Sequence, residues 1–401
     1  MNKFFKVILL ILTLVFSLQT QTFAVEDQDH FSLNSEAAIL IDATTGSILF
    51  EKESDRLMYP ASITKIVTGI IAIEEGNLDD IVTVSKAARN IDGTRVYLLE
   101  GEQVSLKKLV QGLLINSGND AATAIAEYFD KNEAQFAERM NEYVRAKIGV
   151  KDTTFQNPHG LFDQKHQTTA YDMAMITQYA MKNPLFRSIV GTKEMKWVGE
   201  GWETTLYNHN KLLWRYEGTT GVKNGFIDQS GYTLVASVKR GNSEWIAVTL
   251  KSGSSELAYS DMEKLFDYGF EHFENYPIAV NTLSLHQRYQ DQFVLPKELV
   301  FTAEKDLTFK VEIDESEGQI IVVDNNGESI YFEELERIEQ NVQTIIISDP
   351  SLPAESEPSR TSTLKIILLI VATLFTLVFI RTQWIKIKRR NMRKVDKPNG
   401  N

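Results

Sequence analysis

The residues best suited to covalent chemistry are a serine and a lysine one helical turn apart, Ser62 and Lys65. Side chains three residues apart share one face of a helix, so the amine can reach the hydroxyl. A serine hydroxyl is a weak nucleophile until a base takes its proton. A lysine amine can be that base once burial or a nearby cation lowers its pKa. Because Pro60 suits a first helical turn and the residues after Lys65 are mostly apolar, the spacing predicts a Ser62 nucleophile with Lys65 as general base.

A simpler alternative is that Ser62 caps a helix and Lys65 is solvated. Two later segments favour the catalytic interpretation over this alternative. The first combines a serine and an asparagine where an apolar run enters a turn. The second combines a lysine and a glycine ahead of a strand-like stretch. These segments are Ser117-Gly118-Asn119 and Lys223-Asn224-Gly225.

In order and spacing, the three segments resemble the signature of penicillin-binding proteins and β-lactamases, Ser-x-x-Lys, Ser-x-Asn and Lys-Thr-Gly. Further stretches resemble the serine D-Ala-D-Ala carboxypeptidases, the low-molecular-mass penicillin-binding proteins, over roughly residues 34–275. Gly118 stands where β-lactamases normally carry aspartate, which favours the carboxypeptidase branch. The further stretches are 116–122, 155–161, 169–172, 208–213 and 265–270.

The resemblance implies a two-step acyl transfer with a role for each polar residue. Ser62 attacks the carbonyl between two terminal D-alanines while Lys65 takes its proton. Ser117 passes a proton to the leaving amine, and Asn119 positions Lys65 and the substrate amide. Lys223 supplies a positive charge that keeps Lys65 neutral and attracts the terminal carboxylate.

The remaining substrate-binding residues lie next to that lysine. Gly225 lets the substrate backbone lie against the strand, because no side chain blocks its approach. The backbone N–H groups of Ser62 and Phe226 are implied to form the oxyanion hole. Asn224 stands where the family has threonine. Its amide can still donate to a carboxylate, so we expect substrate binding of altered strength.

The composition argues against several other classes of protein. The chain of 401 residues contains no cysteine, which excludes disulfides, cysteine zinc sites and thiol catalysis. Its six histidines form no His-Glu-x-x-His motif, so we expect neither a zinc carboxypeptidase nor any other cofactor. A net charge of −12 argues against binding nucleic acid.

The two ends of the chain predict export and membrane anchoring. Residues 1–24 combine lysines, an apolar segment and a small-residue cleavage site, as signal peptides do, with a buried N-terminal helix as the alternative. Residues 364–380 suit a short transmembrane helix, with an amphipathic surface helix as the competing interpretation. The basic tail 381–401 favours the cytoplasmic side and contact with anionic lipid. We therefore expect a single-pass bacterial membrane protein whose catalytic domain lies outside the cytoplasm.

Between these ends the pattern predicts an α+β catalytic domain over residues 25–275. Strand patterns near both ends, around a helical middle, suit one antiparallel sheet with a helical subdomain. The resemblance implies the same transpeptidase/β-lactamase-like fold. Short alternating runs predict a small all-β domain at 276–348, and the Pro, Glu and Ser content of 349–363 predicts a flexible stalk.

The implied function is a serine D-Ala-D-Ala carboxypeptidase that trims peptidoglycan pentapeptides and is acylated by β-lactams. One alternative is a catalytically weakened peptidoglycan-binding protein that keeps the fold, because Asn224 departs from the family. Another is a β-lactamase, which needs an acid that activates water, and no residue is assigned that role. We expect His159 and His209 to make structural hydrogen bonds rather than to act as bases.

Overall fold

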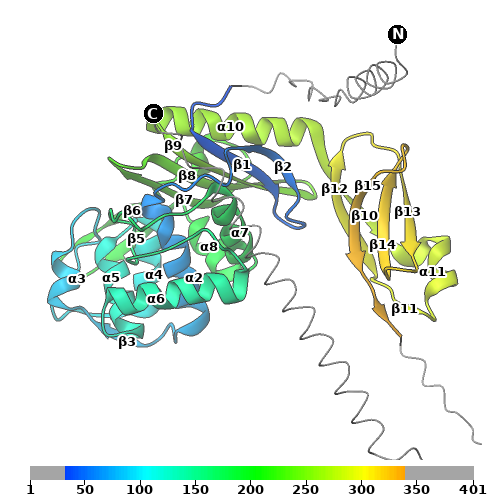
Figure 1. The fold of residues 1–401 in the computed structure, drawn as a ribbon. Helices are drawn as coiled ribbons and strands as arrows, with labels where there is room; N and C mark the ends of the chain where they lie inside the picture. The colour runs from blue at the N-terminus through cyan, green and yellow to red at the C-terminus, as the bar shows by residue number, and fades with distance from the viewer. Residues whose placement is uncertain (1–31, 339–401) are drawn as a thin grey trace, which may run out of the picture. The chain divides into compact units, whose positions relative to one another are not determined.

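The structure, a computed structural model, describes residues 32–338 (Figure 1). Within that part of the chain, no helix is both long and apolar enough to cross a membrane. The predicted catalytic domain is described from residue 32 and the predicted β domain up to residue 338. Four predicted segments lie outside the described residues: the signal peptide (1–24), the stalk (349–363), the transmembrane helix (364–380) and the basic tail (381–401).

An antiparallel sheet in the order β2-β1-β9-β8-β7 forms the centre of the predicted catalytic domain. Its strands are β1 (Ala37–Asp42), β2 (Ile48–Lys52), β7 (Thr219–Ile227), β8 (Gly231–Arg240) and β9 (Ser243–Ser252). β1 and β9 lie far apart in the sequence and pair from Ala37↔Leu250 to Asp42↔Trp245. Among the strands of residues 32–338, β7 has one neighbour, β8, and so forms an edge of the sheet. The antiparallel sheet expected from the sequence is confirmed.

Helices cover both faces of this sheet (Figure 1). They are α10 (Ser255–His272) on one face, and α2 (Lys65–Glu75), α7 (Ala170–Met181) and α8 (Pro184–Val190) on the other. Leu40 packs into the core shared with α10, whereas Ile39 packs into the core shared with α2 and α7. Successive strand residues point to opposite faces, so a strand covered on both sides is buried throughout, as β1 is.

The middle of the domain is helical, as predicted, and it consists of several separate helices. Its elements are α3 (Lys86–Asn90), α4 (Leu106–Ile115), α5 (Asn119–Phe129), α6 (Glu133–Tyr143) and a π-helical turn (Val144–Ile148). The side chain of Asn132 accepts a hydrogen bond from the Gln135 N–H and so caps the N-terminus of α6 as a separate helix. Smaller elements are β3 (Ile81–Thr83), β4 (Gln103–Ser105), β5 (Glu194–Val198), β6 (Glu203–Tyr207) and α9 (Leu212–Arg215).

The region after α10 has its own core, in which Leu299, Phe301, Ile320 and Val322 are buried. It was predicted to be all-β, but it also contains the short helix α11 (Ser284–Tyr289) and a 3-10 turn (Val280–Thr282). Tyr289 of α11 is buried in the same core, so tertiary packing holds a helix too short to persist alone. The strands are β10 (Phe273–Ala279), β11 (Phe293–Val294), β12 (Glu298–Glu304), β13 (Phe309–Asp314), β14 (Gln319–Asp324), β15 (Ser329–Glu334) and β16 (Glu336–Arg337).

Candidate active site

Ser62 and Lys65 are in direct contact. The lysine Nζ lies 3.0 Å from the serine Oγ and donates a second hydrogen bond, of 2.6 Å, to the His159 carbonyl. Lys65 is the first residue of α2, while Ser62 lies in the 3-10 turn Ala61–Thr64 that leads into it. Side chains three apart eclipse one another in a 3-10 helix, so this turn brings the two groups together. The predicted pairing is therefore present, although the two residues do not share one α-helix.

Burial makes Lys65 a candidate base. Its side chain is completely buried, and this desolvation, helped by the charge of Lys223, sets the Lys65 pKa well below its usual value. Asp120 acts in the opposite direction. A neutral amine beside a hydroxyl can accept the hydroxyl proton, whereas an ammonium cannot.

Lys223, on β7, is also buried, and this burial lowers its pKa to about 7. Its Nζ donates to the Asn224 carbonyl at 2.8 Å. An anion placed beside Lys223 would stabilise its charged form. The two lysines therefore suit different tasks, a neutral base and a cation for a carboxylate.

The segment 157–161 packs tightly against the 3-10 turn Ala61–Thr64, which carries Ser62 and is called the nucleophile turn below. Besides the His159 carbonyl bound by Lys65, the Pro158 carbonyl accepts a 2.6 Å hydrogen bond from Thr68 on α2. Gly160 has a φ of +86°, and a Cβ there would lie 1.9 Å from the Ala61 carbonyl oxygen. Only glycine allows both the left-handed backbone and this close approach.

The His159 ring serves this packing. The Nδ1 of His159 accepts a hydrogen bond from the Leu161 N–H, which is the structural role expected for this residue. Its Nε2 lies 3.4 Å from a carboxylate oxygen of Glu133. Burial lowers the pKa of His159 and, with the charges of Lys223 and Lys65, lowers that of His209 to about 4. Both rings are therefore neutral at pH 7.

Ser117 and Asn119 lie where α4 gives way to α5. Ser117 is buried, with a φ of +63°, and Asn119 begins α5. The Asn119 Nδ2 donates to the Asp92 carbonyl at 2.6 Å. This contact ties the helix start to the 92–98 loop, whose Gly93 and Thr94 line the same cavity as Ser62.

Sequence reasoning missed the role of Asp120, the next residue. Its carboxylate accepts hydrogen bonds from the backbone N–H groups of Val96, Leu98 and Ala121. An acidic residue in the first turn of a helix was a visible signal, because carboxylates favour helix starts. Its partners on another loop were not visible.

Strand β7 touches the nucleophile turn directly. A Cβ at Gly225 would lie 2.6 Å from the Ser62 backbone nitrogen and 2.7 Å from the Thr233 Oγ1. Thr233 in turn donates to the Pro60 carbonyl at 2.9 Å. The nucleophile turn therefore rests on the sheet edge, and only a residue without a side chain fits at position 225.

The structure brings several predicted residues to one cavity of about 400 Å³. The cavity is lined by Ser62, Asn119, His159 and Phe226. Lys65 is not a lining residue, but its amine contacts the Ser62 hydroxyl. Ser117, Lys223 and Asn224 are not among its lining residues. The Asn224 Oδ1 is buried and has no hydrogen-bond partner within residues 32–338.

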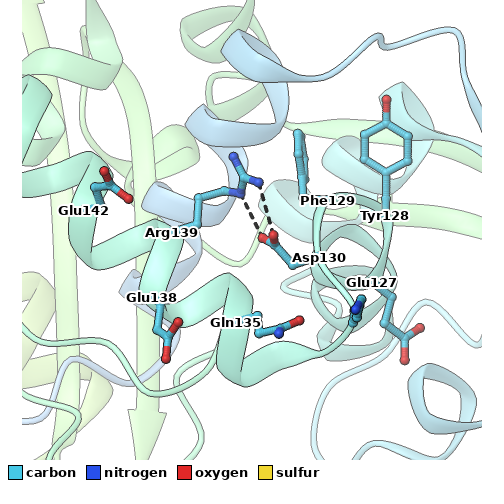
Figure 2. A pocket seen from close by; sticks show the side chains of 9 residues that line it. Glu127, Tyr128, Phe129, Asp130, Gln135, Glu138, Arg139 and Glu142 are labelled. Carbon is cyan, nitrogen blue, oxygen red and sulfur yellow. Dashed lines mark hydrogen bonds and ion pairs between the residues drawn. The ribbon is translucent and has the colours of Figure 1, made fainter.

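A larger hollow of about 660 Å³ lies between α5 and α6 (Figure 2). Its arginine, Arg139, is already bound to Asp130 by two hydrogen bonds of 2.8 and 3.1 Å (Figure 2). Its lining contains no serine or histidine. Among residues 32–338, no group of three or more acidic or histidine side chains could hold a metal ion. The Ser62 cavity is therefore the candidate active site.

Comparison with known proteins points the same way. The sequence model of the D-alanyl-D-alanine carboxypeptidase family matches residues 21–254. The chain is 34% identical over 251 residues to D-alanyl-D-alanine carboxypeptidase DacF of Bacillus subtilis (strain 168), and 34% identical over 248 residues to DacD of Escherichia coli (strain K12). The alignments cover 61% and 59% of this chain and 64% and 63% of the relatives, so the chain spans less than two thirds of their length.

Solved structures share the fold. Penicillin binding protein 5 from Haemophilus influenzae is 27% identical, with a TM-score of 0.67 over 77% of this chain and 97% of that one. Penicillin binding protein 6B from Escherichia coli is 29% identical, with a TM-score of 0.65 over 76% and 95%. The expected transpeptidase-like fold is confirmed.

Proposed function

The chain belongs to the D-alanyl-D-alanine carboxypeptidase family, and we propose that it is a serine carboxypeptidase that removes the terminal D-alanine from peptidoglycan pentapeptide stems. The observation that carries this proposal is the buried Lys65 amine, 3.0 Å from the Ser62 hydroxyl in a cavity-lining turn. The lowered pKa of Lys65 makes it a base for an otherwise weak nucleophile.

The reaction would proceed through an acyl-enzyme. Ser62 Oγ bonds to the carbonyl carbon as its proton moves to Lys65, and the oxyanion accepts hydrogen bonds from the N–H groups of Ser62 and Phe226. Ser117 passes a proton to the departing D-alanine amine, while Asn119 holds the substrate amide. Water then hydrolyses the ester and releases the shortened stem. The close approach of Gly225 to the Ser62 nitrogen supports the placement of the oxyanion hole. One such donor is typically worth about 3 kcal/mol.

The lowered pKa of Lys223 predicts that substrate binding depends on pH. A lysine with a lowered pKa is charged only below that pKa, and for Lys223 the value is about 7. Attraction of the terminal carboxylate should therefore weaken as the pH rises through this value. We expect the KM for a D-Ala-D-Ala peptide to rise between pH 7 and 9, measured by released D-alanine. Lys223→Arg, which stays charged, should flatten this rise. A parent KM that is constant across this range would contradict the assignment.

Position 224 predicts a modest gain of function. Asn224→Thr should raise the rate of acylation by penicillin, because a compact hydroxyl donates to the carboxylate without leaving a buried amide oxygen unpaired. A hydrogen bond to a charged group contributes roughly 1.5–3 kcal/mol, and asparagine keeps part of it, so the gain should be about tenfold or less. The second-order rate of labelling by a fluorescent penicillin measures it. Slower labelling of the variant would show that the site has adapted to the amide.

The ends of the chain complete the proposal. A signal peptide at 1–24 would export the chain, and 364–380 would anchor it, leaving the basic tail against anionic lipid on the cytoplasmic side. The support is compositional: an apolar segment followed by a strongly basic one. External protease should then degrade the catalytic domain of intact spheroplasts but spare an epitope at the C-terminus.

The direct test is to incubate the full-length protein with a peptide ending in D-Ala-D-Ala and to measure released D-alanine, with penicillin labelling in parallel. Release together with a lasting penicillin adduct supports the carboxypeptidase. Peptide binding without release or labelling would favour a non-catalytic peptidoglycan-binding protein. Rapid penicillin turnover without an adduct would favour a β-lactamase.

A further inference from the structure

The amine of Lys65 depends on a backbone carbonyl for its position. Within residues 32–338 it has two hydrogen-bond partners, the Ser62 hydroxyl at 3.0 Å and the His159 carbonyl at 2.6 Å. When the serine proton moves to the amine, the ammonium that forms donates to this carbonyl a charge-assisted hydrogen bond, which is stronger than a neutral one. The place of the His159 carbonyl therefore decides how the base lies beside the nucleophile.

The ring of the same histidine faces a carboxylate. Its Nδ1 accepts a hydrogen bond from the Leu161 N–H at 3.2 Å, and burial lowers its pKa, so the neutral ring carries its proton on Nε2. This Nε2 lies 3.4 Å from a carboxylate oxygen of Glu133, the first residue of α6. No hydrogen bond of ordinary length reaches the buried Nε2 from within residues 32–338, so the long contact with Glu133 is its polar partner there.

Glu133 is itself held as a carboxylate. Its Oε1 accepts a hydrogen bond of 2.5 Å from the Oγ1 of Thr123 on α5. Burial acts to raise the pKa of Glu133, but the contacts with His159 and Thr123 outweigh burial and lower it below its usual value. No lysine or arginine pairs with this carboxylate within residues 32–338. Its charge is therefore directed to the N–H of the His159 ring.

The contact with Glu133 ties the segment 157–161 to α6. Inside the segment, the Asn157 Oδ1 accepts hydrogen bonds from the N–H groups of His159 and Gly160, at 3.3 and 2.7 Å. These bonds set the shape of the segment but do not attach it to α6. The His159 ring supplies that attachment, while the carbonyl of the same residue binds the base. One residue thus joins α6 to the lysine at the start of α2.

Resting on the proposed function, we propose that Glu133 is a positioning residue for acylation: through the His159 ring it fixes the carbonyl that holds the Lys65 amine. Glu133 is not among the residues that line the Ser62 cavity, so it acts through His159 and not on the substrate. It matters in the step in which the amine takes the serine proton, because that step depends on the alignment of the two groups.

The test follows labelling of the full-length protein by penicillin over a range of concentrations, which separates the rate constant of acylation from the dissociation constant of the noncovalent complex. Glu133→Ala should lower the rate constant about tenfold, since a 1 Å misplacement can cost about 10²-fold and a lost long contact should shift the base by less. The dissociation constant should not change. Glu133→Gln keeps an oxygen for the His159 N–H and should restore most of the rate. Glu138→Ala is the matched control, an exposed acid of the same helix without a hydrogen bond or ion pair within residues 32–338.

If urea unfolding shows that Glu133→Ala does not fold, Thr123→Val takes its place. It removes one hydrogen bond to the carboxylate and should lower the rate constant about threefold. A parental rate constant in the folded variant would overturn the inference while the carboxypeptidase stands. So would a change confined to the dissociation constant, an equal loss in Glu133→Gln, or the same loss in Glu138→Ala. A parent that forms no penicillin adduct and releases no D-alanine would overturn the proposed function and this inference together.

Discussion

Ser62→Ala should abolish covalent labelling by penicillin and reduce D-alanine release by at least about 10³-fold. Ser62 supplies the only hydroxyl shown in contact with Lys65 within residues 32–338. The substitution removes one oxygen, and Lys65 keeps its hydrogen bond to the His159 carbonyl. The fold should therefore survive with a similar melting temperature. Intact-protein mass spectrometry after incubation with penicillin measures the adduct directly.

The matched control is Ser188→Ala, an exposed serine of α8 away from the cavity. It should label at the parental rate. A penicillin adduct on the Ser62→Ala protein would place the nucleophile elsewhere. If the Ser62→Ala protein binds the peptide with unchanged affinity, then the Ser62 Oγ contributes to the chemical step and not to binding, as the mechanism requires.

The chemistry of this site was predictable from the sequence because it depends on local spacing. Ser62 and Lys65 are three residues apart, and any right-handed helical turn brings such residues together. The kind of turn was not predictable. The 3-10 turn includes Ala61, with a φ of +51°, and Ala61 packs against Gly160 and Gly225, which come from distant parts of the chain.

The contacts that tune the site escaped sequence analysis for a physical reason. Lys65 is bound by a backbone carbonyl 94 residues away, and every residue type has such a carbonyl. Asp120 was visible as part of a motif, but its three N–H partners are likewise backbone groups. Residue identity reveals which side chains can act, whereas backbone acceptors and donors become visible only in the fold.

Some elements of secondary structure were likewise predictable from the sequence, and others were not. The paired strands β1 and β9 were predicted from their apolar residues, and successive residues of each strand pack into the cores on the two faces of the sheet. The middle of the domain was predicted to be helical, with a turn at Ser117-Gly118-Asn119, and the structure has breaks before α5 and before α6. Asn132, a capping residue, marked the second break. The short helix α11 had no periodicity to reveal it, because six residues are too few.

Gly225→Ala should lower the rate of acylation by about 10²-fold or more. A Cβ at this position would lie 2.6 Å from the Ser62 nitrogen, a contact that real Cβ atoms do not make. Because that nitrogen belongs to the backbone, the nucleophile turn must move away from β7. The movement displaces the Ser62 N–H from the oxyanion, and a donor is worth about 3 kcal/mol. It also disturbs the Ser62 and Lys65 alignment, where a 1 Å error can cost about 10²-fold.

Overpacking of this kind typically destabilises a protein by about 1–3 kcal/mol, so the variant should remain folded at room temperature. Acylation by penicillin and unfolding in urea, measured on the same samples, separate lost chemistry from lost folding. Gly253→Ala is the matched control, since its Cβ would meet only the Leu257 Cδ1 at 4.0 Å. If the Gly225→Ala protein is acylated at the parental rate, then the position of the Ser62 N–H does not depend on the contact between the nucleophile turn and β7. The oxyanion hole would then have to be built from other donors.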